Sequence, residues 1–135
     1  MISIEILGRP LPQKRHRTKG RITYDPSSKE KEAYQWQIRS QFNQSPWETA
    51  LEVRLLFYFR VPKNTSYVKK QQMLKGMIPF KKRPDIDNLV KFVMDCGNEL
   101  LWKDDALIVR LEAEKKYGRE EKTVVLMRNS TEWDI

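Results

Sequence analysis

The chain has 135 residues, a single-domain length that suffices for a hydrophobic core, and 39% of them are hydrophobic while 33% are charged. Its 26 Lys and Arg residues outnumber its 18 Asp and Glu residues, and the net charge of +8 indicates an anionic partner, most commonly nucleic acid, unless it only serves solubility. One cysteine excludes an intrachain disulfide, and the lack of ~18–20 consecutive apolar residues or of a signal-peptide pattern predicts a cytoplasmic protein that does not bind membranes.

The first third of the chain is predicted to contain a strand and a helix. Alternation of isoleucine with polar residues over positions 2–6 is typical of a half-buried strand, which Gly8 would end. A moderate apolar stripe then predicts a structural helix that Ser27 or Ser28 caps and that ends before Pro46.

Between these two elements lies a strongly basic loop or short hairpin, because Pro and Gly exclude a continuous helix. Five cations within eight residues repel one another unless an anion neutralises them, which favours contact with DNA phosphates over a solvated loop. His16, the only histidine, is expected to contact phosphate or solvent rather than to act as a base or metal ligand. The predicted DNA-binding residues of this loop are Lys14, Arg15, Arg17, Lys19 and Arg21.

Three further strands are predicted from alternating apolar residues. Positions 51–61 form a long strand with a rich apolar face, and positions 106–117 alternate in the same way. A turn at 118–119 and a short strand at 123–127 predict a C-terminal hairpin, followed by a frayed tail at 129–135. Together with the helices, these strands predict an α+β fold.

Residues 63–82 interrupt the regular pattern and are predicted to form a basic flap with a short helix over 66–75. The flap could be mobile and become ordered on a charged ligand, or it could be a flexible surface loop without a ligand. Its candidate DNA-binding residues, with the arginine that follows, are Lys69, Lys70, Lys81, Lys82 and Arg83.

Three side chains that can carry function are expected to be structural instead. Trp36 and Trp47 can stack on nucleobases, but packing in the core or at its rim is the favoured interpretation. Cys96 lies among apolar residues, which favours a buried, inert thiol over a nucleophile.

A mostly apolar helix is predicted from Asp87 or Asn88, its candidate N-caps, to about Leu101, with Pro84 keeping Asp85 outside it. Within this helix one polar stripe interrupts the apolar surface, because residues four apart lie on one face. The stripe consists of Asp87, Lys91 and Asp95, continued by Asn98 and Glu99.

Carboxylates concentrated at both ends of one helix in a basic chain predict a metal site. Mg²⁺ prefers oxygen ligands and keeps several waters for substrate phosphates, and Mn²⁺ can replace it. The basic surface would attract a phosphate backbone, Asp85 and Asp87 would converge with Asp104 or Asp105, and Lys91 would stabilise developing negative charge. The alternative interpretation is structural, with the acids as caps and turns and the lysine in helix ion pairs.

The sequences RPDIDNLVK at 83–91 and WKDD at 102–105 resemble the RusA family of Holliday junction resolvases of phages and prophages. The resemblance is specific over 79–109 and looser before it. It implies that residues 1–135 form one domain, in which two main helices pack on a small mixed sheet. It also implies that two copies of this domain form a homodimer. It also implies Mg²⁺-dependent, paired nicking of branched, four-way DNA in recombination and repair. The family's catalytic residues fall on Asp85, Asp87, Asp105 and Lys91, and its less firmly catalytic acids fall on Asp95 and Asp104.

The implied site imposes a geometric requirement. Asp105 follows the C-terminus of the predicted helix but must reach Asp85 and Asp87 at its N-terminus, about 20 Å away at ~1.5 Å per residue. Either the helix is shorter than predicted, or Asp105 completes the site from along the sheet or across a dimer. A C2 dimer would also present two symmetric sites to a four-way junction.

Two other functions fit the same sequence. A non-catalytic nucleic-acid-binding module would use the acids only as caps and turns. A basic scaffold for an acidic protein would show no steep salt dependence of DNA affinity.

Overall fold

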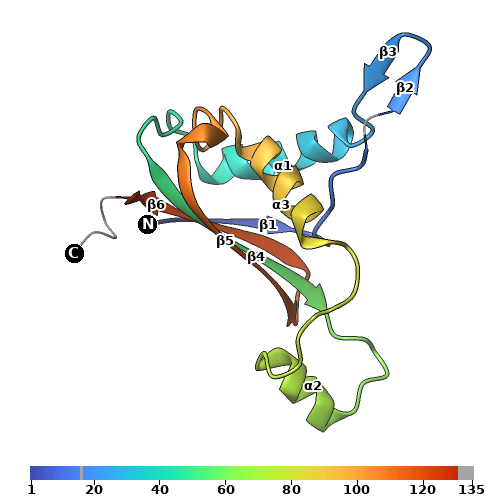
Figure 1. The fold of residues 1–135 in the computed structure, drawn as a ribbon. Helices are drawn as coiled ribbons and strands as arrows, with labels where there is room; N and C mark the ends of the chain where they lie inside the picture. Colours follow the sequence, from blue (N-terminus) through green and yellow to red (C-terminus); the bar gives the residue numbers. More distant parts are fainter. Residues whose placement is uncertain (16, 131–135) are drawn as a thin grey trace.

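A four-stranded mixed sheet organises the molecule (Figure 1), whose computed structural model describes residues 1–15 and 17–130, without the side chains of Arg17 and Lys19. The strand order is β1 (Ile2–Leu7), β6 (Lys122–Asn129), β4 (Leu51–Arg60) and β5 (Ile108–Gly118). Neighbouring strands are antiparallel except for the parallel pair of β4 and β5. The predicted α+β fold and its four strands are thereby confirmed.

The predicted C-terminal hairpin is wrong, because β4 lies between β5 and β6 and pairs with both. Every second residue of β4 from Leu51 to Phe59 is buried, and Glu52 on its other face is buried as well. A strand this apolar is most stable in the centre of the sheet, where both of its edges are hydrogen-bonded. A short turn between two strands therefore does not make them neighbours here.

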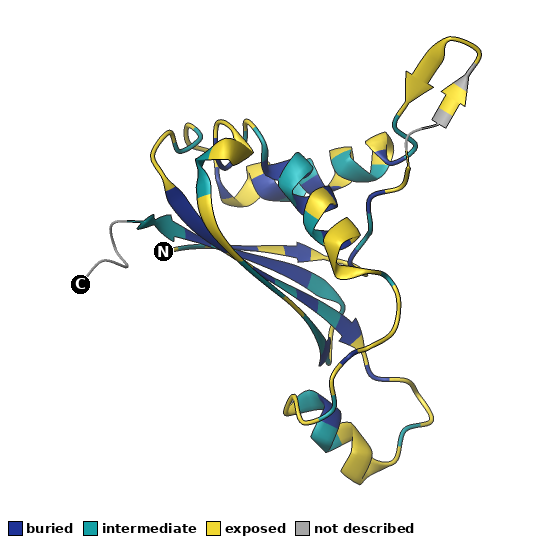
Figure 2. Cartoon of the chain, in the orientation of Figure 1, coloured by how far each residue is buried: buried dark blue, intermediate teal, exposed yellow. Residues whose placement is uncertain are grey.

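Two helices, α1 (Ser28–Gln41) and α3 (Ile86–Gly97), cover one face of the sheet (Figures 1 and 2). They pack through an edge-to-face contact of Tyr34 with Phe92, whose ring centroids are 4.9 Å apart. The N-cap of α1 is Ser27, as one predicted alternative had it, although its side chain makes no capping hydrogen bond. None of the helices in the described ranges has the length and apolar character needed to cross a membrane.

The structural roles expected for three side chains are confirmed for two of them. Trp47 packs against the core and Cys96 is buried in it. Burial raises the pKa of the Cys96 thiol to about 12, so the thiol is inert at neutral pH. Trp36 departs from the prediction, because it is 71% exposed on the outer side of α1. Its apolar neighbours along the helix face the sheet at other helical angles.

The segment between β4 and α3 contains the predicted short helix, α2 (Tyr67–Leu74). Ser66 caps it by accepting a hydrogen bond from the Lys69 amide. Beyond α2 the chain is anchored by Phe80, which is buried, stacks on Phe59 at 4.2 Å and meets Tyr117 edge-on at 5.1 Å. The basic flap is therefore attached to the sheet at both of its ends, and its mobility stays a prediction.

The basic loop after β1 forms the predicted short hairpin, β2 (Arg17–Lys19) and β3 (Ile22–Tyr24), which projects from the body (Figure 1). Gly20, with a φ of 66°, lies in its turn and needs the left-handed conformation that glycine tolerates. Arg21, in the same turn, is exposed.

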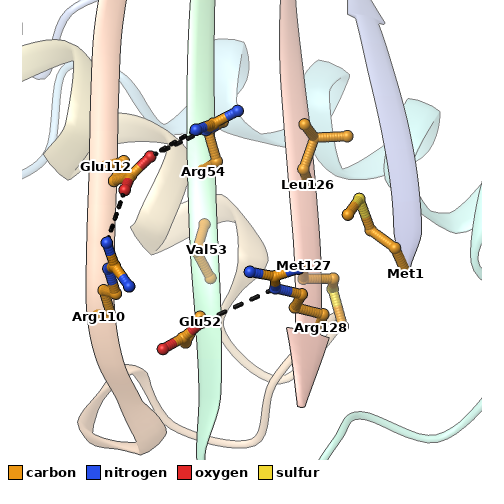
Figure 3. Close-up of a pocket in the computed structure, with 9 residues that line it drawn as sticks. All are labelled: Met1, Glu52, Val53, Arg54, Arg110, Glu112, Leu126, Met127 and Arg128. Carbon is orange, nitrogen blue, oxygen red and sulfur yellow. Dashed lines mark hydrogen bonds and ion pairs between the residues drawn. The ribbon is translucent and has the colours of Figure 1, made fainter. Parts of the chain in front are cut away.

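The face of the sheet opposite the helices carries ion pairs between neighbouring strands and within β5 (Figure 3). Arg54 contacts Glu112 at 2.8 Å, Arg110 contacts the same carboxylate at 3.1 Å, and Arg128 contacts Glu52 at 3.8 Å. These residues border a pocket of about 260 Å³ that includes none of the residues predicted to be functional. Because these charged side chains neutralise one another, this face of the sheet can remain in contact with solvent.

The two edge strands of the sheet differ in how their backbone groups are used. On β1, the side-chain amide of Gln41 accepts from the Glu5 N–H at 2.9 Å and donates to its carbonyl at 2.7 Å. One helical turn earlier, Gln37 makes the same pair of bonds with Leu7, at 2.8 and 3.3 Å. Two glutamines of α1 thus occupy the positions of a further strand, which closes this edge to other chains.

Candidate active site

Asp85 and Asp87 lie at the N-terminal tip of α3, and both are exposed. The helix begins at Ile86 with Asp85 as its N-cap, so Asp87 and Asn88 occupy the first turn and are not the caps predicted. Asp85 has extended backbone angles, as expected for a residue outside the helix (φ −68°, ψ 139°). Among the described groups its carboxylate makes no capping hydrogen bond. It is therefore free to bind an external ligand, which argues against a purely structural role.

The loop that carries Asp85 is held against the sheet by Lys115 of β5. The Lys115 ammonium donates to the carbonyls of Lys82 at 2.7 Å and Pro84 at 3.0 Å, and it lies 5.4 Å from the centre of the Phe80 ring. Charge-assisted bonds of this kind are stronger than neutral ones. They fix the backbone directly before Asp85, so Lys115 is a positioning residue that sequence patterns did not reveal.

The helix ends at Gly97, four residues earlier than predicted, because Trp102 occupies the space beyond it. A Cβ at Gly97 would lie 2.6 Å from the buried Trp102 ring, so only glycine permits this contact. The chain then turns through Glu99, whose φ is 68°, and the indole of Trp102 donates to Asn98 Oδ1 at 3.0 Å. Trp102 thereby determines where α3 stops and where the WKDD sequence is placed.

Asp104 and Asp105 follow Trp102, at the start of a short 3₁₀ turn, η1 (Asp105–Leu107), that leads into β5. Asp104 caps this turn by accepting a hydrogen bond from the Ala106 amide at 3.0 Å, and that bond lowers the pKa of its carboxyl. The turn role considered for Asp104 is thus present, while the Asp105 side chain is exposed beside it.

Asp105 and the pair Asp85 and Asp87 consequently lie at opposite ends of α3 (Figure 1), whose 12 residues span about 18 Å. The shorter helix does not bring Asp105 back, since β5 runs from Asp105 toward Lys115 and the Asp85 loop. Within the described ranges no group of three or more His, Cys, Asp or Glu residues can hold a metal ion. One chain by itself does not gather the three predicted aspartates.

The polar stripe of α3 has the predicted ion pair at its centre, with Lys91 Nζ 3.9 Å from Asp95 Oδ2. Asp95 is also 3.3 Å from Lys31 of α1, which in turn contacts Asp25 at 2.5 Å. Asp95 is therefore committed to a structural network between α1 and α3, whereas Asp87 and Lys91 remain exposed one turn apart. Sequence analysis missed Asp25 and Lys31 because it does not show which helix faces meet.

Partial burial alone would raise the pKa of Asp25, but hydrogen bonds from Lys31, the Ser27 amide and Gln13 lower it from 3.8 to about 2. Because the folded-state pKa is the lower one, this carboxylate stabilises the fold above about pH 4 and loses its effect as pH falls toward 2.

Asp25→Asn is expected to lower the free energy of unfolding by about 1–2 kcal/mol at pH 7, and by progressively less between pH 4 and 2. Urea denaturation of the mutant and the wild type at pH 7, 4 and 3 measures the difference. Glu32→Gln, at an exposed position of α1, serves as the control with no such trend. A deficit that stays constant down to pH 3 contradicts the proposed contribution of the ionised Asp25.

The predicted DNA-binding cations flank the tip of α3 on two sides. The root of the β2–β3 hairpin contacts α3 directly, since the Gln13 amide donates to the Asn88 carbonyl at 2.9 Å, and Lys14 pairs with Glu30 at 3.1 Å. Arg17 and Lys19 are placed on β2 by their backbone, and His16 lies outside the described residues. The exposed cations on the two sides are Arg15, Arg21, Lys69, Lys70, Lys81, Lys82 and Arg83.

A family model described as "Endodeoxyribonuclease RusA" matches residues 7–128 of the chain. The chain belongs to the RusA family. The match runs from the last residue of β1 through most of β6 and contains Asp85, Asp87, Lys91 and Asp105, so the resemblance noted in the sequence is confirmed.

A curated relative, described as "Uncharacterized protein YqaN" of Bacillus subtilis (strain 168), is 38% identical over 73 residues. The aligned part makes up 53% of this chain and 51% of the relative, so the chain spans about half the length of that relative.

RusA endodeoxyribonucleases are in general metal-dependent, and the residues at the tip of α3 suit such a group. Asp85 and Asp87 offer exposed carboxylate oxygens, the ligand type that Mg²⁺ prefers, and the Asp85 carboxylate is not used by the helix. Two carboxylates leave room for water and phosphate oxygens, which Mg²⁺ retains in nucleases and related enzymes.

Proposed function

We propose that this RusA-family protein is a Mg²⁺-dependent endonuclease that resolves four-way DNA junctions by paired, symmetric nicks. The observation that carries the proposal is the pair of exposed carboxylates, Asp85 and Asp87, at a helix tip flanked by two basic segments. Cations on both sides favour approach of a phosphate backbone, and the exposed carboxylates of Asp85 and Asp87 lie between them.

In the proposed site each side chain has a distinct role. Asp85 and Asp87 hold the metal ion, which when bound lowers the pKa of a water molecule and neutralises charge on the scissile phosphate. Lys91, exposed one turn along the same helix face, stabilises negative charge that develops on the phosphate. Lys115 keeps the Asp85 loop in place through the carbonyls of Lys82 and Pro84.

Asp105 joins this site from a second copy of the chain. The β1 edge is closed by Gln37 and Gln41, whereas on the outer edge of β5 no described strand or side chain takes such a place. Val109 and Leu111 on β5 are 62% and 40% exposed, an apolar surface that an edge strand in water usually avoids. The β5 strand of a second copy, paired antiparallel with this one, would cover both the open edge and the exposed apolar side chains.

Pairing about a twofold axis at Leu111 gives a favourable register. It sets Leu111 opposite Leu111 of the partner subunit and Arg110 opposite Glu112 of the partner subunit, which joins apolar to apolar and opposite to opposite charge. Continued past the start of β5 at Ile108, the same register brings Asp105 toward Tyr117 of the partner subunit, two residues from the lysine that holds the Asp85 loop. The third aspartate of each site would thus come from the other chain.

Leu111→Lys is expected to weaken the dimer by at least roughly tenfold, because the axis would then place two ammonium groups opposite each other. Sedimentation equilibrium measures the dissociation constant of the mutant and of the wild type. Leu7→Lys is the matched control, since Leu7 is 61% exposed on the closed edge. A wild-type monomer, or equal weakening by both substitutions, contradicts pairing through β5.

Incubation with a synthetic four-way junction and Mg²⁺ tests the function itself. We expect two nicks at symmetric positions, no product with EDTA, and little cleavage of the linear duplex of the same sequence. Intact junction arms at high protein concentration would instead indicate a binding module without nuclease activity.

A further inference from the structure

A pocket of about 560 Å³ lies between α2 and the ends of β4 and β5, and Asp85, Asp87 and Lys91 are not among its lining residues. All of its charged lining residues are basic, namely Arg60, Lys63, Lys70 and Arg119. Of these, Lys70 is a candidate DNA-binding residue from the sequence and Lys63 begins the same flap, whereas the fold brings Arg60 and Arg119 to them from the ends of β4 and β5.

Within the described part of the chain, none of these four cations takes part in an ion pair. Glu121, which lies at this end of the sheet, is already used, since it pairs with Arg9 at 3.1 Å and accepts from the backbone amide of Arg60 at 3.4 Å. On the helix-free face, by contrast, Arg54 and Arg110 share Glu112. Four unneutralised cations around one hollow repel one another, and an anion in the hollow would relieve that repulsion.

Hydrogen-bonded strand ends and a turn hold the backbone at three of these cations. Arg60 ends β4 and lies in register with Gly118, directly before Arg119. A Cβ at Gly118 would be 2.9 Å from the Tyr58 ring, which keeps this end of the strand close to β4. Lys63 stands in a turn closed by two bonds from Thr65 to the Pro62 carbonyl, at 3.3 and 2.7 Å. The pocket is therefore built from fixed strand ends and a tight turn.

We propose that this pocket binds phosphate groups of a DNA arm whose cleavage site lies at Asp85 and Asp87. This inference rests on the proposed function and adds Arg60, Lys63 and Arg119 to the DNA-binding residues. Arg119 directly follows the end of β5 and lies four residues after Lys115, a separation of at most ~13 Å at ~3.3 Å per residue. Since Lys115 holds the Asp85 loop, one duplex arm can contact both places.

The test measures metal-free binding of the full-length protein to a four-way junction over a series of salt concentrations. Arg60→Gln combined with Arg119→Gln is expected to lower the slope of log K against log salt by about 1.8, at ~0.9 per lost phosphate contact. Arg39→Gln, an exposed arginine of α1 remote in sequence from the pocket, is the control and should leave the pocket contribution intact. Thermal melting of each variant confirms that it is folded.

Two results would overturn the proposal: a salt slope unchanged in the double variant, or a wild type that binds no DNA. A second experiment distinguishes free phosphate from DNA as the ligand: the Nε–H signals of Arg60 and Arg119 are followed in NMR spectra. Shifts with a short duplex but not with millimolar inorganic phosphate support a DNA site, and the reverse contradicts it. If the wild type binds junctions steeply with salt but does not cut them, the proposed nuclease function fails while the pocket stands.

Discussion

Asp87→Asn is expected to reduce the rate of junction cleavage by roughly 10³-fold or more, while junction affinity is kept or slightly increased. The substitution removes a metal ligand and a negative charge that a phosphate must approach. Asp87 is exposed in the first turn of α3, where loss of its favourable interaction with the helix dipole costs only about 0.3–1 kcal/mol. Unfolding therefore does not account for such a loss of activity.

Single-turnover cleavage at saturating protein, together with metal-free gel-shift affinity, separates the two effects. Glu32→Gln makes the same change of charge at an exposed position of α1 and should change neither quantity. If Asp87→Asn cleaves like the wild type, Asp87 serves only the helix N-terminus and the metal site lies elsewhere.

Mixing two inactive variants should restore activity if each site is shared between two chains. A dimer of one Asp87→Asn chain and one Asp105→Asn chain has both substitutions in one site and neither in the other. After random exchange of subunits, half of the dimers are mixed and each has one intact site, so about a quarter of wild-type nicking is expected. Because only one site works, the product should be a nicked junction and not a resolved one.

The comparison uses equal amounts of the two variants, exchanged by mild denaturation and refolding, and each variant treated alone. If all three aspartates of a site came from one chain, every site in the mixture would carry a substitution. No activity above that of the separate variants would then be found. The experiment thus tests the contribution of Asp105 across the dimer without a structure of the complex.

Alternation of apolar residues predicted all four strands of the sheet, and β4 within one residue of its observed end. The same pattern determines which face of a strand is buried but not which strand lies beside it, so the hairpin of β5 and β6 was predicted wrongly. Helix α3 was predicted too long because Leu100 and Leu101 continue its apolar pattern, whereas the Trp102 ring against Gly97 stops it.

The candidate site was predictable to the extent that it lies within one segment. Asp85, Asp87 and Lys91 are close together because one helix carries them, and helical spacing can be read from sequence. Lys115 was not predicted because its partner Pro84 lies more than 30 residues away in the sequence. The network of Asp25 and Lys31 was not predicted because Asp95, which Lys31 contacts, lies more than 60 residues away from it. Contacts of this kind depend on how the elements pack, which residue periodicity does not specify.

The glutamine bonds on β1 also limit how far the protein can assemble. In the proposed dimer the two sheets join through β5, so both outer borders of the combined sheet are β1 strands. Gln37 and Gln41 occupy the backbone groups of Leu7 and Glu5 on each border, which disfavours pairing with a third chain there. If the proposed dimer forms, these two side chains would oppose its growth into a filament by strand pairing, and two copies are the expected size of the assembly.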